Sequence, residues 1–375
     1  MINCDFKVFH PLGGASYVFE RNFIKFISSN IKKKNVVISV GAQPNSSPHF
    51  GTLCVFSLAF SLARKLMDYN QDLKISVLFE VVDTAPNETV NINGINYQYN
   101  LKNSEKMDMA MKDFISVLDY FSKKDRIPYK VRNQNDFNSQ PEIKKIISKI
   151  IKSRKKIEKL LDPKKEKLRI RVACPKCGLV DKEGNTTTIS KKEIISTCPK
   201  HGKHKAIYKN ESNKLEYNTP LRNLVRGMLY GTINTSKKYD YEIIRITGGD
   251  YSGFYQEELL YKVASLCDFK VDKLPMIIYC PQILDWSGAK LSKSLYVSEG
   301  AYSDLPSYLM NYKELYKTFK YKGLDIIHEE TNLWLEESYR LFRNYSVYYF
   351  IKLFEKKEGE RNDWIKNCTK RNYRK

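Results

Sequence analysis

Short apolar runs alternate with longer amphipathic segments along most of the chain. The runs at 35–40, 73–82, 127–131, 241–246 and 274–279 have the length and the β-branched content of buried strands. Segments with helical spacing flank them, at 12–31, 50–67, 104–123 and 142–161, from Thr219 onward, and at 254–266. Strands that alternate with helices predict an α/β protein with a parallel sheet. After residue 304 the pattern is helical, with amphipathic segments near 305–319 and 330–355.

A loop with Gly and Pro follows the first predicted strand. It contains Pro44 and leads through His49-Phe50-Gly51-Thr52 into a long apolar helix. The first N–H groups of a helix have no partner within it, and its dipole adds positive charge, so such a junction is suited to phosphate. Gly51 would let a flat ring approach the backbone, and His49 can donate to a phosphate oxygen. Because α/β proteins also place Gly and Pro here for packing, the stretch alone indicates a nucleotide site only weakly.

Two further strand ends carry acidic side chains. Thr247-Gly248-Gly249-Asp250 directly follows the strand at 241–246, and a Gly junction beside a carboxylate suits hydroxyl groups such as those of a ribose. Asp83 follows the strand at 73–82. Ligands of open α/β sheets collect at the carboxyl ends of strands, so Asp83 is a candidate substrate contact. A helix or turn cap explains Asp83 equally well.

The composition adds a basic charge and a globular core. Hydrophobic residues make up 42% of the 375 residues, and the formal net charge is +22. The sequence holds neither an apolar run of about eighteen residues nor the apolar core of a signal peptide, so we expect a cytoplasmic chain with no membrane partner. The charge favours a polyanionic partner such as nucleic acid. Lysine is abundant together with Asn, Ile and Tyr, as in AT-rich coding sequences, and a solvated face is the commoner explanation of the basic helix at 142–161.

The segment 174–204 has the ligand spacing of a zinc ribbon. Cys174-x-x-Cys177 and Cys198-x-x-His201 are each followed by Gly (Gly178 and Gly202), which frees backbone N–H groups to approach the sulfur atoms. Four protein ligands would complete the coordination of Zn²⁺, so the sequence predicts a structural rather than a catalytic metal. His204 is the alternative to His201 as the fourth ligand.

Lys290-Leu291-Ser292-Lys293-Ser294 connects these pieces. It resembles the KMSKS loop of class I aminoacyl-tRNA synthetases, with Leu for Met, and 49–52 then resembles the HIGH motif of that class. The insertion with its zinc ribbon, the segment 218–222 and Gly248-Gly249-Asp250 are similar to the class I lysyl-tRNA synthetases. The resemblance covers residues 35–300. It implies a Rossmann-like (HUP-type) fold in four parts. These are a first half (1–135), a helical and zinc-ribbon insertion (136–235), a second half (236–300) with the KMSKS-like loop at 290–294, called the lysine loop below, and a short helical C-terminal region (301–375).

The resemblance also implies a reaction and a set of roles. An amino-acid carboxylate would attack the α-phosphate of ATP, with Mg²⁺ and with pyrophosphate leaving, and the site would act mainly by positioning and electrostatics. The expected catalytic residues are His49, Thr52, Lys290 and Lys293. The expected ATP-binding residues are Pro44, Gly51, Gly248, Gly249, Asp250 and Ser292, and the expected substrate-binding residues are Asp83 and Gln256. Lysine is the amino acid that the resemblance suggests, although these residues reveal no lysine-specific contact.

The sequence departs from the family pattern at two points. Thr52 stands where HIGH has its second His, and the region after Lys293 is much shorter than the anticodon-binding region of the lysyl enzymes. Three functions remain open: a ligase that charges tRNA, a paralogue that uses the adenylate to acylate a small molecule or peptide, and a non-catalytic RNA-binding or regulatory protein with the same fold. The lysine loop speaks against the third, and the net charge favours the first over the second. The oligomeric state is not predicted.

Overall fold

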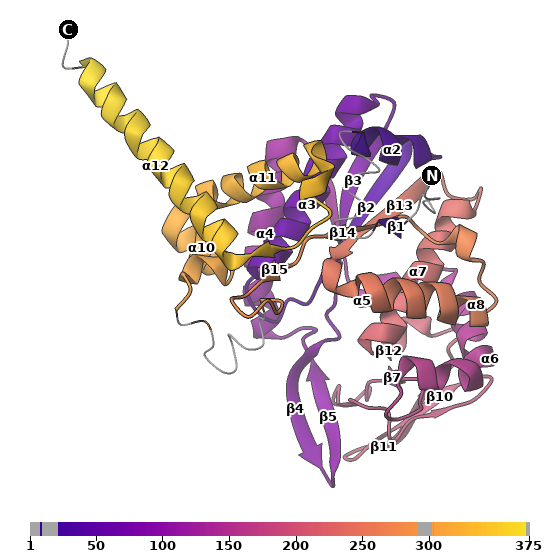
Figure 1. Cartoon of the computed structure of the whole chain (residues 1–375). Coiled ribbons are helices and arrows are strands. Elements are labelled where there is room, and N and C mark those ends of the chain that lie inside the picture. The colour runs from indigo at the N-terminus through magenta and orange to yellow at the C-terminus, as the bar shows by residue number, and fades with distance from the viewer. Residues whose placement is uncertain (1–7, 10–21, 292–301, 303, 373–375) are drawn as a thin grey trace.

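The computed structural model describes residues 8–9, 22–291, 302 and 304–372. A six-stranded sheet with only parallel neighbours forms its centre (Figure 1). The strands, in spatial order, are β1 (Val8–Phe9), β14 (Ile277–Cys280), β13 (Tyr241–Gly248), β2 (Asn35–Ala42), β3 (Lys74–Val81) and β6 (Tyr129–Arg132). The predicted Rossmann-like α/β class is confirmed. The predicted strand at 274–279 starts later, at Ile277, because a 3₁₀ turn (Val271–Lys273) and Pro275 precede it.

The order of the strands places a ligand site. From β2 the chain moves to β3 and β6 on one side, and later to β13 and β14 on the other. This reversal makes the gap between the carboxyl ends of β2 and β13 the topological switch point, which is where open α/β sheets bind ligands. β2, β3 and β13 are mostly apolar and buried, as the continuous runs predicted, but they also bury the polar side chains of Ser39, Glu80 and Arg245.

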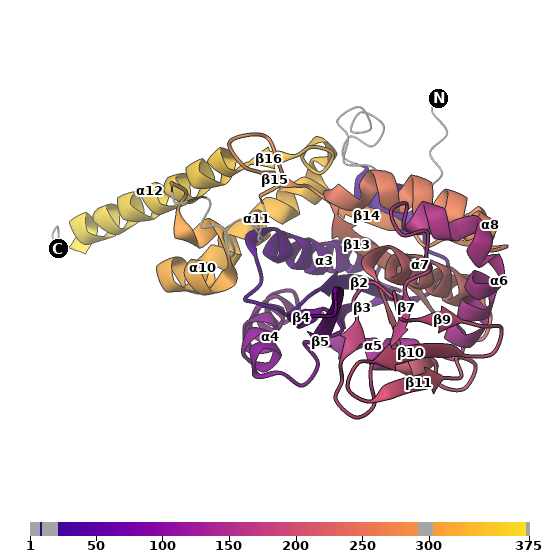
Figure 2. The same ribbon diagram turned by 90° about the horizontal axis from the view of Figure 1, so that it is seen from below.

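Helices cover both faces of the sheet (Figures 1 and 2). One core joins the sheet to α2 (Phe23–Asn30), α3 (Phe50–Tyr69), α4 (Glu105–Asp125) and α11 (Tyr321–Glu336). The other joins it to α6 (Ile143–Leu161), α7 (Thr219–Thr235), the π-helix η4 (Phe254–Val263) and α8 (Ala264–Leu266). By length and composition α3 is also apolar enough to cross a membrane, but 72% of its most apolar window is buried inside the fold. Packing between the sheet and α11 therefore accounts for its apolar character.

A lobe of small antiparallel sheets, called the lower lobe, lies below the central sheet in Figure 1. The hairpin of β4 (Pro86–Ile92) and β5 (Ile95–Asn100) pairs with β8 (Val180–Asp181). The other strands of this lobe are β7 (Ile170–Val172) with β12 (Leu215–Tyr217), and β9 (Thr188–Ile189), β10 (Ile194–Cys198) and β11 (Gly202–Ala206). The sequence patterns did not predict the β4–β5 hairpin. Its signal was Asn93-Gly94, which both adopt positive φ (52° and 77°) as a two-residue hairpin turn requires.

The C-terminal region packs on the first core. α10 (Tyr312–Phe319) and α11 follow each other, and α12 (Val347–Asn372) extends away from the body in both views (Figures 1 and 2). The prediction of one helical segment over 330–355 is wrong, because the chain leaves the helix after Glu336 and pairs β16 (Tyr345–Ser346) with β15 (Ile283–Leu284). The N–H of Tyr345 donates to the carbonyl of Gln282 at 2.9 Å, so strand pairing replaces a helical turn there.

Ser57, His328 and Asp125 form a buried hydrogen-bonded row between α3, α11 and α4. Ser57 Oγ lies 3.1 Å from His328 Nδ1, and His328 Nε2 lies 3.0 Å from Asp125 Oδ1. The order of groups matches that of a serine-hydrolase triad. Ser57 is completely buried, however, and no described cavity reaches it. The row therefore pairs buried polar groups and fixes α11 on the core rather than forming a second active site.

A close backbone approach makes Gly231 necessary in α7. A Cβ at this position would lie 2.3 Å from the carbonyl oxygen of Lys273 and 2.9 Å from Phe269 Cζ. Gly→Ala normally stabilises a helix by about 1 kcal/mol, but a backbone clash costs about 1–3 kcal/mol or more. We expect Gly231→Ala to lower the urea midpoint of unfolding, measured by circular dichroism.

Gly359→Ala is the matched control, since a Cβ at that helical position of α12 meets nothing within 4 Å. It should leave the midpoint unchanged or raise it slightly. Equal midpoints for the two variants would contradict the packing described for Gly231.

Candidate functional site

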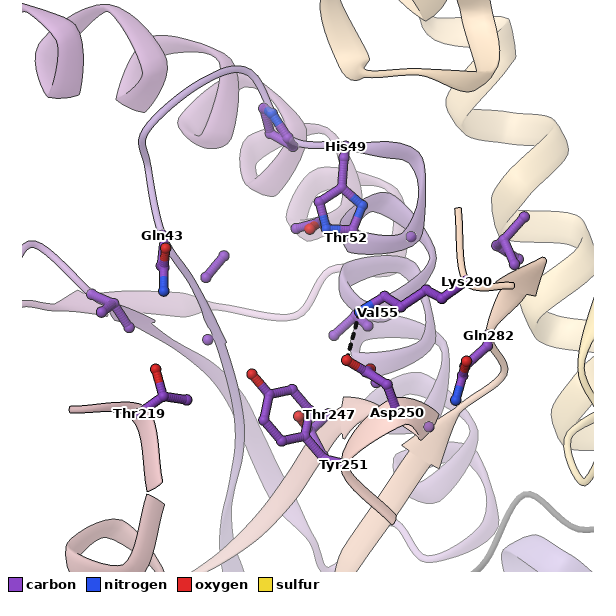
Figure 3. A pocket seen from close by; sticks show the side chains of 18 of the residues that line it. Gln43, His49, Thr52, Val55, Thr219, Thr247, Asp250, Tyr251, Gln282 and Lys290 are labelled. Atoms are coloured by element: carbon purple, nitrogen blue, oxygen red, sulfur yellow. Dashed lines mark hydrogen bonds and ion pairs between the residues drawn. The ribbon is translucent and has the colours of Figure 1, made fainter. Parts of the chain in front are cut away.

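A cavity of about 310 Å³ opens at the switch point of the sheet. It is lined by the end of β2 (Gly41, Ala42), most of the following loop and helix start (Gln43, Asn45, Ser47, Pro48, His49, Gly51, Thr52), the first turns of α7, the end of β13 and the turn after it (Arg245, Thr247, Gly248, Gly249, Asp250, Tyr251), and Lys290. Figure 3 shows His49 and Thr52 at the start of α3, with Asp250 and Lys290 facing them. Segments that are far apart in the sequence thus meet at the carboxyl edge of β2 and β13, as the strand order requires.

His49 caps the start of α3 and lies over Gly51. Its backbone is extended (φ −73°, ψ 162°) and its side chain makes no capping bond. A Cβ on Gly51 would lie 3.1 Å from His49 Cε1, so a larger residue would push the imidazole away. Backbone bonds connect this turn to the C-terminal region, from Phe50 N to Met310 O (3.2 Å) and from Tyr312 N to Pro48 O (2.8 Å). The helix N-terminus is therefore held rigidly at the edge of the cavity.

Asp250 and Lys290 form an ion pair at the edge of the cavity formed by β13 (Figure 3). Lys290 Nζ lies 2.6 Å from Asp250 Oδ2, and both side chains are partly exposed. A Cβ on Gly248 would lie 2.5 Å from Asp250 Oδ1, so only glycine at this position leaves room for the carboxylate. A partly exposed pair of this kind contributes little to stability, so a ligand can replace either partner at small cost.

Arginines line the wall of the cavity on the side of α7. Thr219, Arg222, Asn223 and Arg226 lie on one face of α7 at helical spacing, and Arg245 joins them from β13. The three arginines are at most 5% exposed. Arg222 Nε, Arg226 Nε, and Nε and Nη1 of Arg245 are buried and have no hydrogen-bond partner within the part of the chain that the structure describes.

Buried carboxylates compensate this positive charge only in part. Glu80 bonds to Arg132 and accepts from the Tyr230 hydroxyl at 2.6 Å. Although burial opposes its ionisation, Arg132 and Arg226 hold the pKa of Glu80 below its ordinary value. Burial, and then the guanidiniums of Arg226 and Arg171, lower the pKa of Arg222 to about 9. Arg222 therefore carries its charge in a place that disfavours it.

The remaining predicted site residues lie elsewhere. Pro44 is buried beside the cavity but is not among its lining residues. Asp83 lines a second cavity of about 610 Å³ near the cysteines and accepts a bond from Gln134 N at 3.3 Å; burial raises its pKa. Gln256 is buried in η4 and its Nε2 bonds to Tyr261 Oη at 3.0 Å. Ser292 and Lys293 are outside the described residues, so all five roles stay predictions.

The predicted zinc ligands come together. The four ligand atoms of Cys174, Cys177, Cys198 and His201 lie within 4.8 Å of one another. The Sγ atoms of Cys177 and Cys198 are 3.7 Å apart, and His201 Nδ1 is 3.6 Å from Cys174 Sγ. Zn–S bonds of about 2.3 Å at tetrahedral angles require sulfur atoms about 3.8 Å apart, so the four residues fit Zn²⁺. Gly178 and Gly202 have φ of +74°, which favours glycine in both turns.

His201, rather than His204, completes the cluster. His204 Nε2 lies 2.9 Å from the carbonyl oxygen of Val172, away from the sulfur atoms. The cluster also supports the β4–β5 hairpin, because Tyr97 of β5 packs against Cys174 and Cys198 in one small core. A metal here would therefore hold the hairpin and the wall of the second cavity in place.

The arginine wall was missed from the sequence. Its signals were present, since Arg222 and Arg226 are four residues apart in an otherwise apolar helix, and Arg245 interrupts the apolar strand YEIIRI. A charged residue within a buried segment needs a partner or a ligand. Only the fold brings the two segments to one wall.

Comparison with protein-family models and with curated protein sequences finds no match. Among solved structures the chain has a distant likeness to a putative arginyl-tRNA synthetase from Campylobacter jejuni, with a TM-score of 0.33 and 13% identity over 79% of this chain and 63% of that one. For arginyl-tRNA synthetase from Plasmodium falciparum the TM-score is 0.33, with 12% identity over 82% of this chain and 52% of that one. The chain thus spans less than two thirds of the length of either. We therefore infer function from the residues of the site.

Zinc content tests the metal cluster. We expect the purified protein to contain about one zinc ion per chain, and His201→Ala to lose most of it during dialysis, because three ligands bind Zn²⁺ far less tightly than four. The measurement is elemental analysis of the dialysed protein.

His204→Ala is the matched control, since His204 lies in the same hairpin and bonds to a backbone carbonyl instead. It should retain its zinc. A zinc-free wild-type protein, or loss of zinc from the His204 variant alone, would show that the ligand set is wrong.

Proposed function

We propose that the chain is an ATP-dependent ligase of the class I aminoacyl-tRNA synthetase type, which converts an amino acid to an aminoacyl-adenylate. The observation that supports this most is the meeting of His49, Gly51, Asp250 and Lys290 in one cavity at the switch point. His49 and Gly51 belong to the segment that resembles the first motif of that class, Lys290 belongs to the segment that resembles the second, and Asp250 lies between them in the sequence. A cavity with convergent polar groups at this position of an α/β sheet is the expected place of a substrate site.

The proposal gives each side chain a role. The ribose would take the place of Lys290 on Asp250, since a carboxylate accepts bonds from hydroxyl groups and the present ion pair is partly exposed. Lys290, once released, would turn toward the phosphates. His49 and the N-terminus of α3 would hold the α/β-phosphate region, with Thr52 as an uncharged donor. Gly51 would allow the adenine to approach the backbone.

The chemistry requires positioning and charge stabilisation. The amino-acid carboxylate forms a bond to the α-phosphorus, and the bond to the pyrophosphate oxygen breaks. Charge on the transferring group and on the departing pyrophosphate would be stabilised by His49 and by the lysines of the 290–294 loop. Mg²⁺ would arrive with ATP, and the zinc cluster would have a structural role.

The net charge of +22 favours tRNA as the acceptor. The alternative acceptor is a small molecule or a peptide. Under the third hypothesis, the chain is a non-catalytic RNA-binding or regulatory protein with the same fold, and it would not form an adenylate. We expect the protein to act in the cytoplasm.

ATP–pyrophosphate exchange with a panel of amino acids, with and without total tRNA, tests the proposal. Lys290→Met should reduce kcat/KM for exchange by about 10²- to 10³-fold, because an ammonium that stabilises developing charge is lost while the apolar stem is kept. Lys322→Met, at an exposed position of α11 outside the cavity, is the control and should exchange like wild type.

Exchange by Lys290→Met within about threefold of wild type would exclude the proposed role of this lysine. Absence of exchange with every amino acid, also in the presence of tRNA, would rule out both enzyme hypotheses.

A further inference from the structure

The first cavity has two chemically different walls. Asp250, Lys290 and Gln282 lie together on one side, and Thr219 lies across the opening from them (Figure 3). Arg222 and Arg226 follow Thr219 on the same face of α7, so the guanidiniums belong to the Thr219 side. His49 and the start of α3 close the cavity above both. If ATP takes the side of Asp250 and Lys290, the arginine side is left for the second substrate.

The arginine side carries a positive charge that the buried carboxylates of Glu80 and Glu216 compensate only in part. Asp250 is the one acidic residue among the described residues that line the cavity, and it is already paired with Lys290. Glu80 lies beneath the cavity and is bonded to Arg132 and Tyr230. Arg222 donates one hydrogen bond to the carbonyl of Tyr217 (2.9 Å), and Arg226 donates one to Asn223 Oδ1 (3.3 Å). Four guanidinium nitrogen atoms of the three arginines remain buried without a hydrogen-bond partner among the described residues.

Such an arrangement is costly unless an anion binds there. A buried charge without a counter-ion destabilises a fold by several kcal/mol, and a buried donor without a partner costs about 1–3 kcal/mol. Burial, and then the guanidiniums of Arg226 and Arg171, lower the pKa of Arg222, so its charge is disfavoured where it stands. Rings hold two of the guanidiniums in place, since Arg245 Cζ is 5.7 Å from the ring of Tyr255 and Arg226 Cζ is 5.6 Å from that of Phe137. The donors are thus pre-organised, as in sites that bind anions.

We propose that Arg222, Arg226 and Arg245 bind the side-chain anion of an acidic amino acid, so that the substrate activated at this site carries a second negative group. This inference rests on the proposed adenylation. The α-carboxylate cannot satisfy the arginines, because it must point away from them to attack the α-phosphate. A lysine side chain would bring its ammonium against three guanidiniums without an acidic partner.

The chemistry that fits is a carboxylate or a phosphate on a short side chain. Aspartate and glutamate carry the first and phosphoserine the second, and planar guanidinium groups bind both in a bidentate way. Asn223, between the two arginines of α7, adds an amide to the same wall.

The amino-acid panel of the exchange assay tests this directly on the wild-type protein. We expect exchange with aspartate, glutamate or phosphoserine, which separate a carboxylate from a phosphate, and none above background with lysine or arginine. Preferred exchange with lysine or with a neutral amino acid would overturn the inference and leave the proposed adenylation intact. No exchange with any amino acid would overturn both.

Arg222→Met tests the wall itself. The variant keeps the length and the apolar volume of the side chain but removes the charge, so the KM for the acidic amino acid should rise about 10- to 100-fold. The KM for ATP should change by less than about threefold. If the KM for ATP rises instead, the arginines bind the triphosphate and the inference is wrong.

Two further variants complete the test. Arg340→Met removes an arginine that lies outside the cavity and should leave both KM values unchanged. Arg245→Lys keeps the positive charge but loses the planar guanidinium that can bind an anion with two donors. Its KM for the amino acid should therefore lie between the KM of wild type and that of Arg222→Met. If Arg222→Met does not fold, the Arg245→Lys measurement and the wild-type panel still decide.

Discussion

The ion pair of Glu80 and Arg132 sets the charge balance beneath the carboxyl edge of the sheet. Glu80 is 1% exposed and also accepts a bond from Tyr230, whose hydroxyl is 2.7 Å from Ser39 Oγ of β2. The pair therefore joins β2, β3, β6 and α7 through one buried carboxylate. Arg132 forms the direct ion pair with this carboxylate, and Arg226 and Arg245 also interact with it. One carboxylate thus serves several guanidiniums, and the arginines above it keep an excess of positive charge. An anionic substrate would provide the missing charge.

The parts around the sheet hold the edges of the site. Residues 310–312 bond to both sides of the His49 turn, so the packing of α10 and α11 on α3 positions the start of α3. The cysteine cluster does the same for the lower lobe, where Tyr97 packs on Cys174 and Cys198 beside the cavity that Asp83 lines. Both regions thus act on the site through backbone geometry rather than through catalytic side chains.

Apolar periodicity predicted the central sheet and its helices, because β2, β3, β13 and β14 are largely buried within the fold. It failed where pairing decides the structure: β16 breaks a helical pattern to pair with β15, and the hairpin at Asn93-Gly94 has mixed polarity. The resemblance to the synthetase motifs assigned His49, Gly51, Asp250 and Lys290 to one site, and in the structure all four line one cavity. Arg222 and Arg245 were not predicted as site residues, because only the fold brings α7 and β13 together at one cavity. The sequence also cannot show whether a buried arginine has a hydrogen-bond partner.

The most direct test of this account is a crystal structure with a non-hydrolysable analogue of an acidic aminoacyl-adenylate, a sulfamoyl adenosine bearing aspartate or glutamate. The account predicts that the ribose hydroxyls bond to Asp250 and the adenine lies near Gly51. The side-chain carboxylate should lie within hydrogen-bond distance of Arg222 or Arg245. An analogue bound with its side chain toward Lys290 and its phosphate mimic on the arginines would contradict the assignment of the two walls. Binding outside this cavity would contradict the site itself.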